Sequence, residues 1–174
     1  MSKAELKQYY KEYADMVYNL ALNYLQNAQE AEEVTQDVFV KLHFKLDSFK
    51  GNSSLKTWIY RIAINQCSDY VKSRNTQKRS SKVLRLSTLD GNNAGFGSNF
   101  DHPGVALEHK EATQRIFDKL NLLPKNQKAA ILLKSIEHLS QKQIAQTLDV
   151  SEKSVESLLN RGRKKLKELL KNEG

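Results

Sequence analysis

Glycine and proline, the residues that most often interrupt regular structure, are scarce in this chain and unevenly placed. The 174 residues include seven glycines and two prolines, and five of these nine lie between residues 91 and 104. Proteins made of many strands depend on frequent turns, which draw heavily on both residue types. We therefore expect an all-α fold with one irregular stretch.

The aromatic residues divide the chain into two parts of different composition. All seven tyrosines, the tryptophan and three of six phenylalanines precede residue 71, whereas residues 104–174 contain only Phe117. Between these parts, residues 77–103 are rich in serine, asparagine and glycine and show no apolar periodicity, which is typical of a flexible linker. The expected organisation is an N-terminal helical bundle over 1–76, a linker over 77–103 and a second domain over 104–174.

Apolar residues recur at steps of three and four along three segments of the first domain, as they do in amphipathic helices. The first segment covers 6–24 and Asn27 marks its end, while the second covers 31–46 and carries acids around its first turns. Acids there suit the helix dipole. A turn follows, and Ser54 is placed to cap a third helix.

The end of the second domain has the pattern of a helix-turn-helix. A helix is predicted over 124–138, with Pro124 at its first position. The sequence SQKQ at 140–143 has capping-box spacing for the next helix, and Ser151 is placed to cap the last one. Asp149 lies in the turn between them, where glycine is commonest, and aspartate tolerates the left-handed conformation.

The charge balance indicates an anionic partner for this second domain. The chain carries 28 Lys and Arg against 20 Asp and Glu, and residues 104–174 carry 14 against 9, a net charge of +5. Cations beside a helix-turn-helix favour DNA binding, although a solvated helix with a basic end would look similar. The candidate DNA-contacting residues are Lys153, Ser154, Glu156, Ser157, Asn160, Arg161 and Lys164.

Aromatic and cationic side chains alternate over residues 49–65 of the first domain. Phe49, Trp58 and Tyr60 could stack on bases while Lys50, Lys56 and Arg61 follow a backbone, as in sites that bind single strands. Aromatic residues at helical spacing are more often core residues, and that interpretation is favoured for Trp58 on spacing alone.

No group of residues in the sequence favours an enzyme. The acids Glu30, Glu32, Glu33 and Asp37 have no histidine beside them and no metal-type spacing, so a solvated or partner-binding face is the better interpretation. The four histidines are scattered, and a single cysteine, Cys67, excludes an internal disulfide. We expect no catalytic residues, no metal and no cofactor.

Hydropathy predicts a cytoplasmic protein. No run of about 18 apolar residues occurs, so no membrane span is expected. The first 25 residues carry acids and tyrosines where a signal peptide needs an apolar centre.

Short motifs follow one another in order along both domains. In the first they are AQEAEEVTQDVF (28–39), LDSFKG (46–51) and TWIYRIAIN (57–65) with Asp69; in the second they are Leu123-Pro124, Leu139-Ser140, Ile144-Ala145, Val150-Ser151 and RGRKKL (161–166). With these motifs the chain resembles the extracytoplasmic-function (group IV) sigma factors of bacterial RNA polymerase over nearly its whole length.

The resemblance implies how each part of the chain would act. Residues 1–76 would be sigma region 2 and would bind the clamp coiled coil of the largest polymerase subunit through Glu30, Glu32, Glu33, Gln36 and Asp37. The linker would thread the polymerase toward the RNA exit path. Residues 104–174 would be sigma region 4, which reads the −35 promoter element and touches the flap of the second-largest subunit.

The resemblance also implies that region 2 melts the −10 element and holds a flipped base, with Asn65 near that base. Flipping costs a few kcal/mol of unstacking, which an aromatic and polar pocket would offset. The residues implied for the −10 element are Phe49, Lys50, Ser53, Ser54, Lys56, Trp58, Tyr60, Arg61, Asn65 and Lys72.

The last helix departs from the family pattern Gly-Thr-Val-Lys/Arg-Ser-Arg. This chain has Lys153-Ser154-Val155-Glu156-Ser157-Leu158, so an acid and a leucine replace two cations. Glutamate can accept from cytosine N4 but repels phosphate, and can therefore sharpen or abolish reading of the −35 element. Upstream recognition is then open to help from another DNA-bound protein, and an anti-sigma factor is a further candidate partner.

Two other functions remain open on the sequence. A helix-turn-helix regulator would bind duplex DNA alone, and an interaction adaptor would bind polymerase without reading DNA. The aromatic and cationic first domain favours the sigma factor, because a plain regulator needs no single-strand pocket.

Overall fold

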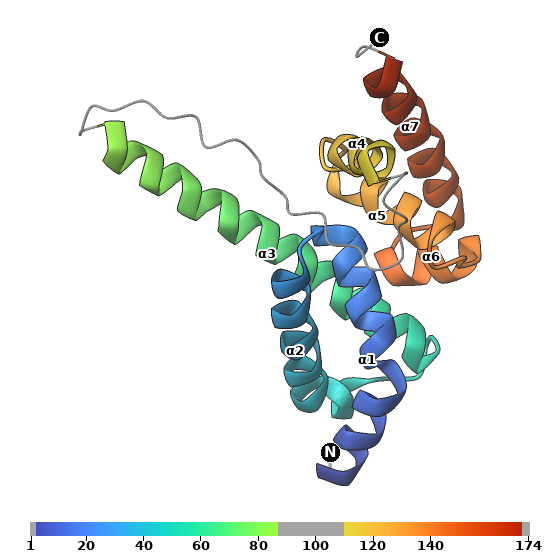
Figure 1. The fold of residues 1–174 in the computed structure, drawn as a ribbon. Helices are drawn as coiled ribbons and strands as arrows, with labels where there is room; N and C mark the ends of the chain where they lie inside the picture. Colours follow the sequence, from blue (N-terminus) through green and yellow to red (C-terminus); the bar gives the residue numbers. More distant parts are fainter. Residues whose placement is uncertain (1–2, 87–109, 172–174) are drawn as a thin grey trace.

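The computed structural model describes residues 3–86 and 110–171, and all regular structure in those ranges is helical (Figure 1). The first domain contains α1 (Lys3–Leu25), α2 (Ala28–Lys45), the short 3-10 helix η1 (Leu46–Ser48) and α3 (Leu55–Leu86). The second contains α4 (Lys110–Leu120), α5 (Lys125–Ser135), α6 (Gln141–Leu148) and α7 (Glu152–Lys171). The all-α prediction is confirmed.

The three long helices of the first domain pack around an apolar core. Its fully buried members come from all three helices and include Val17, Leu20, Val34, Val38, Leu42, Ile59 and Ala63. Asn27, predicted as the end of the first helix, is the N-cap of α2, because its Oδ1 accepts from the Glu30 amide at 2.9 Å. Ser54 caps α3 as predicted, accepting from the Thr57 amide at 3.1 Å.

The third helix is longer than predicted. It continues through residues 77–86 of the expected linker, and its C-terminal half runs away from the body of the molecule (Figure 1). No glycine or proline occurs between Leu55 and Leu86, so no residue in this segment strongly disfavours the helix. Residues 87–103 of the predicted linker lie outside the described residues.

The second domain has the predicted helix-turn-helix in α6 and α7. Ser140 and Gln143 form the capping box of α6, and Asp149 ends that helix in the left-handed conformation with φ 58° and ψ 49°. Ser151 then caps α7 by accepting from the Ser154 amide at 3.1 Å. Pro124 differs by one position from the prediction, because it is the N-cap of α5 and the helix itself begins at Lys125.

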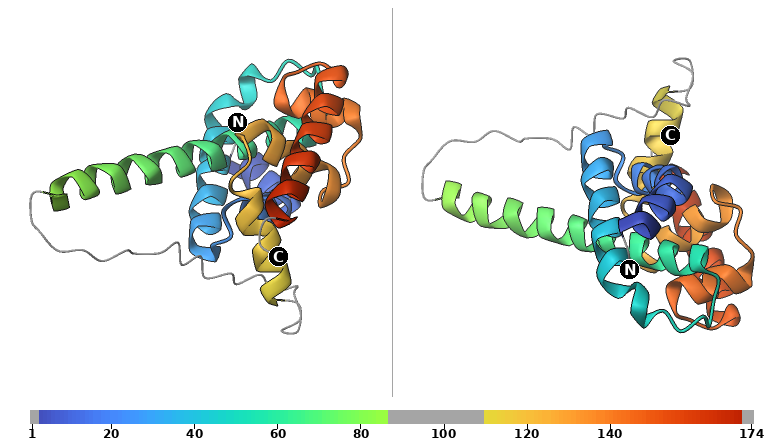
Figure 2. Two further views of the ribbon diagram at one scale, coloured as in Figure 1. Left: turned by 90° about the horizontal axis from the view of Figure 1, so that it is seen from above. Right: turned by 90° about the horizontal axis from the view of Figure 1, so that it is seen from below.

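The two domains lie against each other. Helices α5 and α6 of the second domain contact α1 and the first half of α3, and Figure 2 shows this from two sides. The buried apolar residues of both domains join in one cluster. The long helix α3 therefore presents its N-terminal half to the helix-turn-helix.

Candidate nucleic-acid and polymerase interfaces

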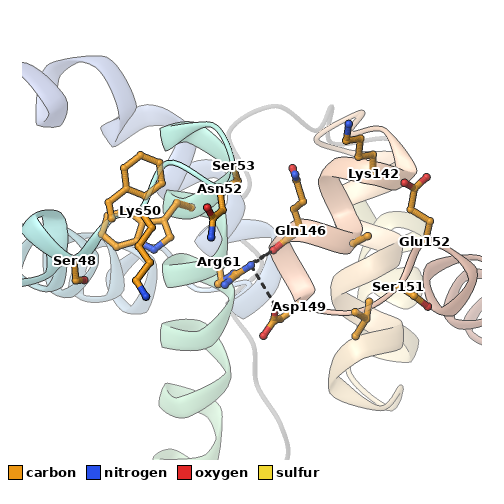
Figure 3. Close-up of a pocket in the computed structure, with 14 residues that line it drawn as sticks. Ser48, Lys50, Asn52, Ser53, Arg61, Lys142, Gln146, Asp149, Ser151 and Glu152 are labelled. Atoms are coloured by element: carbon orange, nitrogen blue, oxygen red, sulfur yellow. Dashed lines mark hydrogen bonds and ion pairs between the residues drawn. The ribbon is translucent and has the colours of Figure 1, made fainter.

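A cavity of about 800 Å³ lies between the two domains (Figure 3). One wall is the segment that leads into α3, with Phe49, Lys50 and Ser53, together with Trp58 and Arg61 on α3 itself. The other wall is the helix-turn-helix, from Lys142 through Glu152. Five of the residues assigned to the −10 element from the sequence are thus brought together.

An aromatic pair forms the base of the first wall. The rings of Phe49 and Trp58 lie 5.1 Å apart between centroids with an interplanar angle of 39°. Both residues are half-buried, and Trp58 also packs against the core. Trp58 therefore packs against the core, as its spacing favours, and also lines the cavity.

Two polar residues on the same face of α3 are held by the second domain. The Arg61 guanidinium donates to the Gln146 carbonyl and lies 3.6 Å from the Asp149 carboxylate. Asn65 is exposed, and its Oδ1 accepts from Lys125 at 3.3 Å.

Tyr60 does not lie in the cavity. It is 2% exposed, and its hydroxyl donates to Glu137 at 2.8 Å. Burial and this acceptor raise the pKa of the Tyr60 phenol. In this arrangement Tyr60 packs in the interior between the domains and is not available to stack on a base.

The other residues assigned to the −10 element lie around this wall. Lys56 is exposed, with its ammonium 5.9 Å from the centre of the Tyr60 ring. Ser54 is engaged in capping α3. Lys72, about two turns beyond Asn65 on α3, is exposed and lies 3.6 Å from Asp69.

Three of the four acids on α2 contact α3. Glu30 accepts from Arg74, Glu33 accepts from the Tyr70 hydroxyl at 3.0 Å, and Asp37 accepts from Gln66 at 2.9 Å. These acids therefore line the junction between two helices, and Glu30 is the most enclosed of them, with a side chain 17% exposed.

An exposed stripe on α2 contains two residues that the sequence assignment missed. Glu32, Gln36, Val40 and Phe44 follow at intervals of four and are all exposed, Val40 at 55% and Phe44 at 77%. Residues four apart share one face of a helix. The signal in the sequence is the same spacing of four residues, and the predicted contact included Glu32 and Gln36 but not Val40 or Phe44.

The recognition helix α7 presents most of its candidate DNA contacts to solvent. Lys153, Glu156, Ser157, Asn160, Arg161 and Lys164 are exposed. Ser154 is half-buried and shares a 2.8 Å hydrogen bond with Ser151. Leu158 is half-buried and packs against the core, so it does not lie on the exposed face.

Within 3–86 and 110–171, no three His, Cys, Asp or Glu residues are grouped so that they could hold a metal ion. In the same ranges no helix has the length and apolar character needed to cross a membrane.

Comparison with known proteins matches both domains. The family model Sigma-70 region 2 matches residues 9–77, and Sigma-70, region 4 matches residues 113–166. The chain is 29% identical to the ECF RNA polymerase sigma-E factor of Escherichia coli K12 over 151 residues, 87% of this chain and 78% of that protein. It is 29% identical to the ECF RNA polymerase sigma factor SigW of Bacillus subtilis 168 over 164 residues, 92% and 86% of the two chains.

Two solved structures have a similar fold. The sigma factor RpoE, in complex with the anti-sigma factor NepR from Bartonella quintana, matches with a TM-score of 0.66 and 25% identity, covering 96% of this chain and 97% of that one. CnrH, in complex with the cytosolic domain of CnrY, matches with a TM-score of 0.66 and 21% identity over 99% and 92%.

Proposed function

Because this chain belongs to the extracytoplasmic-function sigma factors of the sigma-70 family, we propose that it directs promoter-specific transcription initiation by binding core RNA polymerase in the cytoplasm. The observation that carries the proposal is the presence of region 2 and region 4, in that order, over most of the chain. The sigma factor would supply binding and DNA recognition, and the polymerase would supply the chemistry.

The exposed stripe on α2 is the proposed contact with the clamp coiled coil of the largest subunit. It combines a carboxylate, an amide and two apolar side chains that are all exposed: Glu32, Gln36, Val40 and Phe44. Burying Phe44 in a complex would remove a large apolar surface from water. Glu33 and Asp37 would flank this contact, whereas Glu30 would support the fold of α2. Region 4 would contact the flap of the second-largest subunit.

The first wall of the cavity is the proposed −10 site. The Phe49–Trp58 pair offers an aromatic surface at 5.1 Å spacing, and Arg61 and Asn65 offer polar groups on the next two turns of α3. An aromatic platform beside cations suits a melted strand, because bases stack and phosphates pair with the charges. Lys50, Ser53, Lys56 and Lys72 would contact the backbone along this face.

The exposed side of α7 is the proposed contact with duplex DNA upstream. Its net positive charge supplies affinity of the kind that depends on counterion release. Glu156 weakens that contact, so a DNA-bound recruiting protein would assist at some promoters. Two solved relatives are complexes with anti-sigma factors or with a cytosolic partner domain, which supports a regulator of that kind here as well.

Run-off transcription with core polymerase on a randomised promoter library tests the central proposal. The full chain should enrich promoters that share a −10 element. If no promoter is transcribed above core polymerase alone, the chain is not a sigma factor, and binding of the chain alone to duplex DNA would then favour the helix-turn-helix regulator.

Variants on α2 test the polymerase contact. Replacing Glu32, Glu33 and Asp37 by lysine should weaken core binding more than about tenfold, a loss of about 1.4 kcal/mol. Phe44→Ala should weaken it independently, and Glu12→Lys, on the exposed side of α1, is the matched control. Unchanged co-purification of the triple and Phe44 variants with core polymerase would exclude this face.

The Asn65→Ala variant tests the −10 site. Asn65 is exposed, so its loss should leave the fold intact. Initiation should fall on a closed template and recover partly on a template already melted over the −10 element. Wild-type initiation on both templates would show that the pocket lies elsewhere.

A further inference from the structure

Gln66 is a residue of α3 that α2 holds by both ends of its side-chain amide. Its Nε2 donates to the Asp37 carboxylate at 2.9 Å, and its Oε1 accepts from the Lys41 ammonium. Asp37 and Lys41 are four residues apart, so the amide bridges two neighbouring turns of α2. A flipped amide would set donor against donor and acceptor against acceptor, so the bridge allows one orientation of Gln66.

This bridge lies beside the proposed −10 residues. Tyr70 and Arg74 make further contacts with α2 on the next two turns of α3. Of these three contacts, the one made by Gln66 lies nearest to the start of the helix, directly after Asn65 and five residues beyond Arg61. A rotation of α3 at Gln66 would therefore move the side chain of Asn65.

The apolar core alone fixes this rotation less firmly. Burial of apolar surface sets how closely two helices approach, but it is not directional. The core residues that adjoin Gln66 along α3 include Ala63 and Cys67, which are small and 0% exposed. A small side chain interlocks less with the facing helix than a large one does. The bridge adds the directional contact that fixes α3 against α2.

The bridge is also placed where it can affect position more than stability. Gln66 and Lys41 are half-buried and Asp37 is exposed, so water competes for the same hydrogen bonds. A residue that recognises a ligand, however, must be held within about 0.5 Å of its working position. Loss of the bridge can therefore impair recognition in a chain that still folds.

We propose that Gln66 is a positioning residue for the −10 element, which fixes the rotation of α3 against α2 and so sets where Asn65 meets the flipped base. The inference rests on the proposed −10 site. It gives Lys41 a role that the sequence did not indicate, that of holding Gln66. Because α2 would bind the polymerase, the bridge would also fix the orientation of α3 relative to the enzyme.

Two variants of Gln66 break the bridge in different ways. Gln66→Leu keeps a side chain of similar size and removes both hydrogen bonds. Gln66→Lys keeps a contact with Asp37 but sets a second ammonium against Lys41.

An exchange of the two side chains should restore the bridge. Lys41→Gln in the Gln66→Lys background again places an ammonium between the Asp37 carboxylate and an amide oxygen. Gln77→Lys is the matched control, because it makes the same substitution at an exposed position of α3.

Base preference in initiation is the measurement that reports position. The full chain is assayed at saturating core polymerase on selected promoters that carry each of the four bases in turn along the −10 element. The reference is the position at which Asn65→Ala relaxes the preference. Gln66→Leu and Gln66→Lys should lower the preference there by about tenfold, because misplacing a contact by about 1 Å is enough for such a loss. The exchange variant should recover most of it, and Gln77→Lys should keep it.

Thermal unfolding separates positioning from stability. Gln66→Leu should melt within about 2 °C of the wild type, because the site is half-exposed. Wild-type base preference in both Gln66 variants would overturn the positioning role. A loss of preference that follows the melting temperature through all variants, with no recovery in the exchange variant, would overturn it as well and make Gln66 a packing residue.

The same templates judge the proposed function separately. If the wild type directs no initiation, the sigma-factor function fails. If the wild type initiates but Asn65→Ala changes no base preference, the −10 assignment fails and the positioning of Asn65 fails with it. If Asn65→Ala relaxes a preference that the Gln66 variants keep, the positioning role alone fails.

Discussion

Arg74 donates from one guanidinium nitrogen to both carboxylate oxygens of Glu30, at 2.9 and 2.8 Å, and so ties α3 to the first turn of α2. The two side chains are 30% and 17% exposed. Glu32, two residues further along, is exposed. The acids of α2 thus divide into three that contact α3, of which Glu30 is the most enclosed, and Glu32, which is exposed outside that junction.

Replacing Glu30 and Glu32 by glutamine should separate these roles. Glu30→Gln should lower the free energy of unfolding by about 1–3 kcal/mol, because it leaves a partly buried guanidinium without its charged acceptor. Glu32→Gln should change it by less than about 0.5 kcal/mol. Urea unfolding followed by circular dichroism measures both, and equal losses for the two variants would contradict the division.

Gly162 lies where α7 crosses α5 closely, so a larger residue there should crowd the neighbouring side chains. A Cβ at this position would lie 2.9 Å from Ile131 Cδ1 and 3.3 Å from Gln127 Cβ, where α7 crosses α5. Gly162→Ala should therefore destabilise region 4 by about 1–3 kcal/mol, as other overpacked cores do.

Ile131→Val removes the methyl group that the new Cβ would meet. An Ile→Val change typically costs about 0.5–1.5 kcal/mol of stability. In the Gly162→Ala background, Ile131→Val should cost less than this or restore stability. Thermal unfolding of the two single variants and the double variant gives the coupling free energy between the two substitutions. Simple additivity of the two losses would show that the clash is not the cause.

Lys128, on α5, is 5% exposed and donates to the Tyr24 carbonyl of the first domain at 2.6 Å, so it should make the stability of the folded chain depend on pH. Burial lowers its pKa from 10.5 to about 7, and the nearby Cys67 and Tyr24 have pKa values raised to about 12, so they stay neutral over this window. Arg74 also disfavours the charged lysine. Between pH 7 and about 10 the unfolded chain binds more protons at this residue than the folded chain, so stability contributed here rises with pH and is lost as pH falls toward 7.

Between pH 7 and 8.5 the free energy of unfolding should increase by about 1.5 kcal/mol. This corresponds to a rise of roughly 3–6 °C in melting temperature for a chain of this size. Lys128→Met should remove this rise, whereas Lys134→Met should keep it. Parallel pH profiles for Lys128→Met and the wild type would show that Lys128 keeps its ordinary pKa.

The local structure of the chain could be predicted from its sequence because caps and turns depend on near neighbours. The Ser140–Gln143 box, the Ser151 cap and the left-handed Asp149 all follow from spacing alone. The end of α3 could not be predicted in this way. A polar segment without glycine or proline permits both a linker and a continuing helix, and the sequence pattern favoured the first.

Contacts between segments far apart in the chain could not be predicted from the sequence. The sequence pattern placed Tyr60 on a helix. It could not show that Glu137 of the other domain accepts a hydrogen bond from the Tyr60 hydroxyl. Lys128 was counted only as one of the cations of region 4, because nothing in its neighbours shows that it is buried against Tyr24. Burial of a charge is a property of the tertiary structure and leaves no local pattern.

The recognition helix allows a last prediction about charge on the DNA-contacting face. Glu156 is exposed, so Glu156→Arg should add one phosphate contact, raise affinity on most duplex sequences and steepen the slope of log K against log salt by about one unit. Leu158 is half-buried against the core, so Leu158→Arg should instead cost stability and add little to binding. The sequence pattern treated positions 156 and 158 alike, as two places where a cation is missing. In the structure only position 156 is exposed to DNA.

Salt titrations with a set of unrelated duplexes distinguish an added phosphate contact from direct base reading. Affinity should rise on all of them, and discrimination between them should rise less, because phosphate contacts position the protein without reading sequence. If Glu156→Arg instead abolished tight binding to one duplex, Glu156 would be a base-reading residue that accepts from cytosine. Region 4 would then recognise its upstream element alone, and the DNA-bound recruiting protein would be unnecessary.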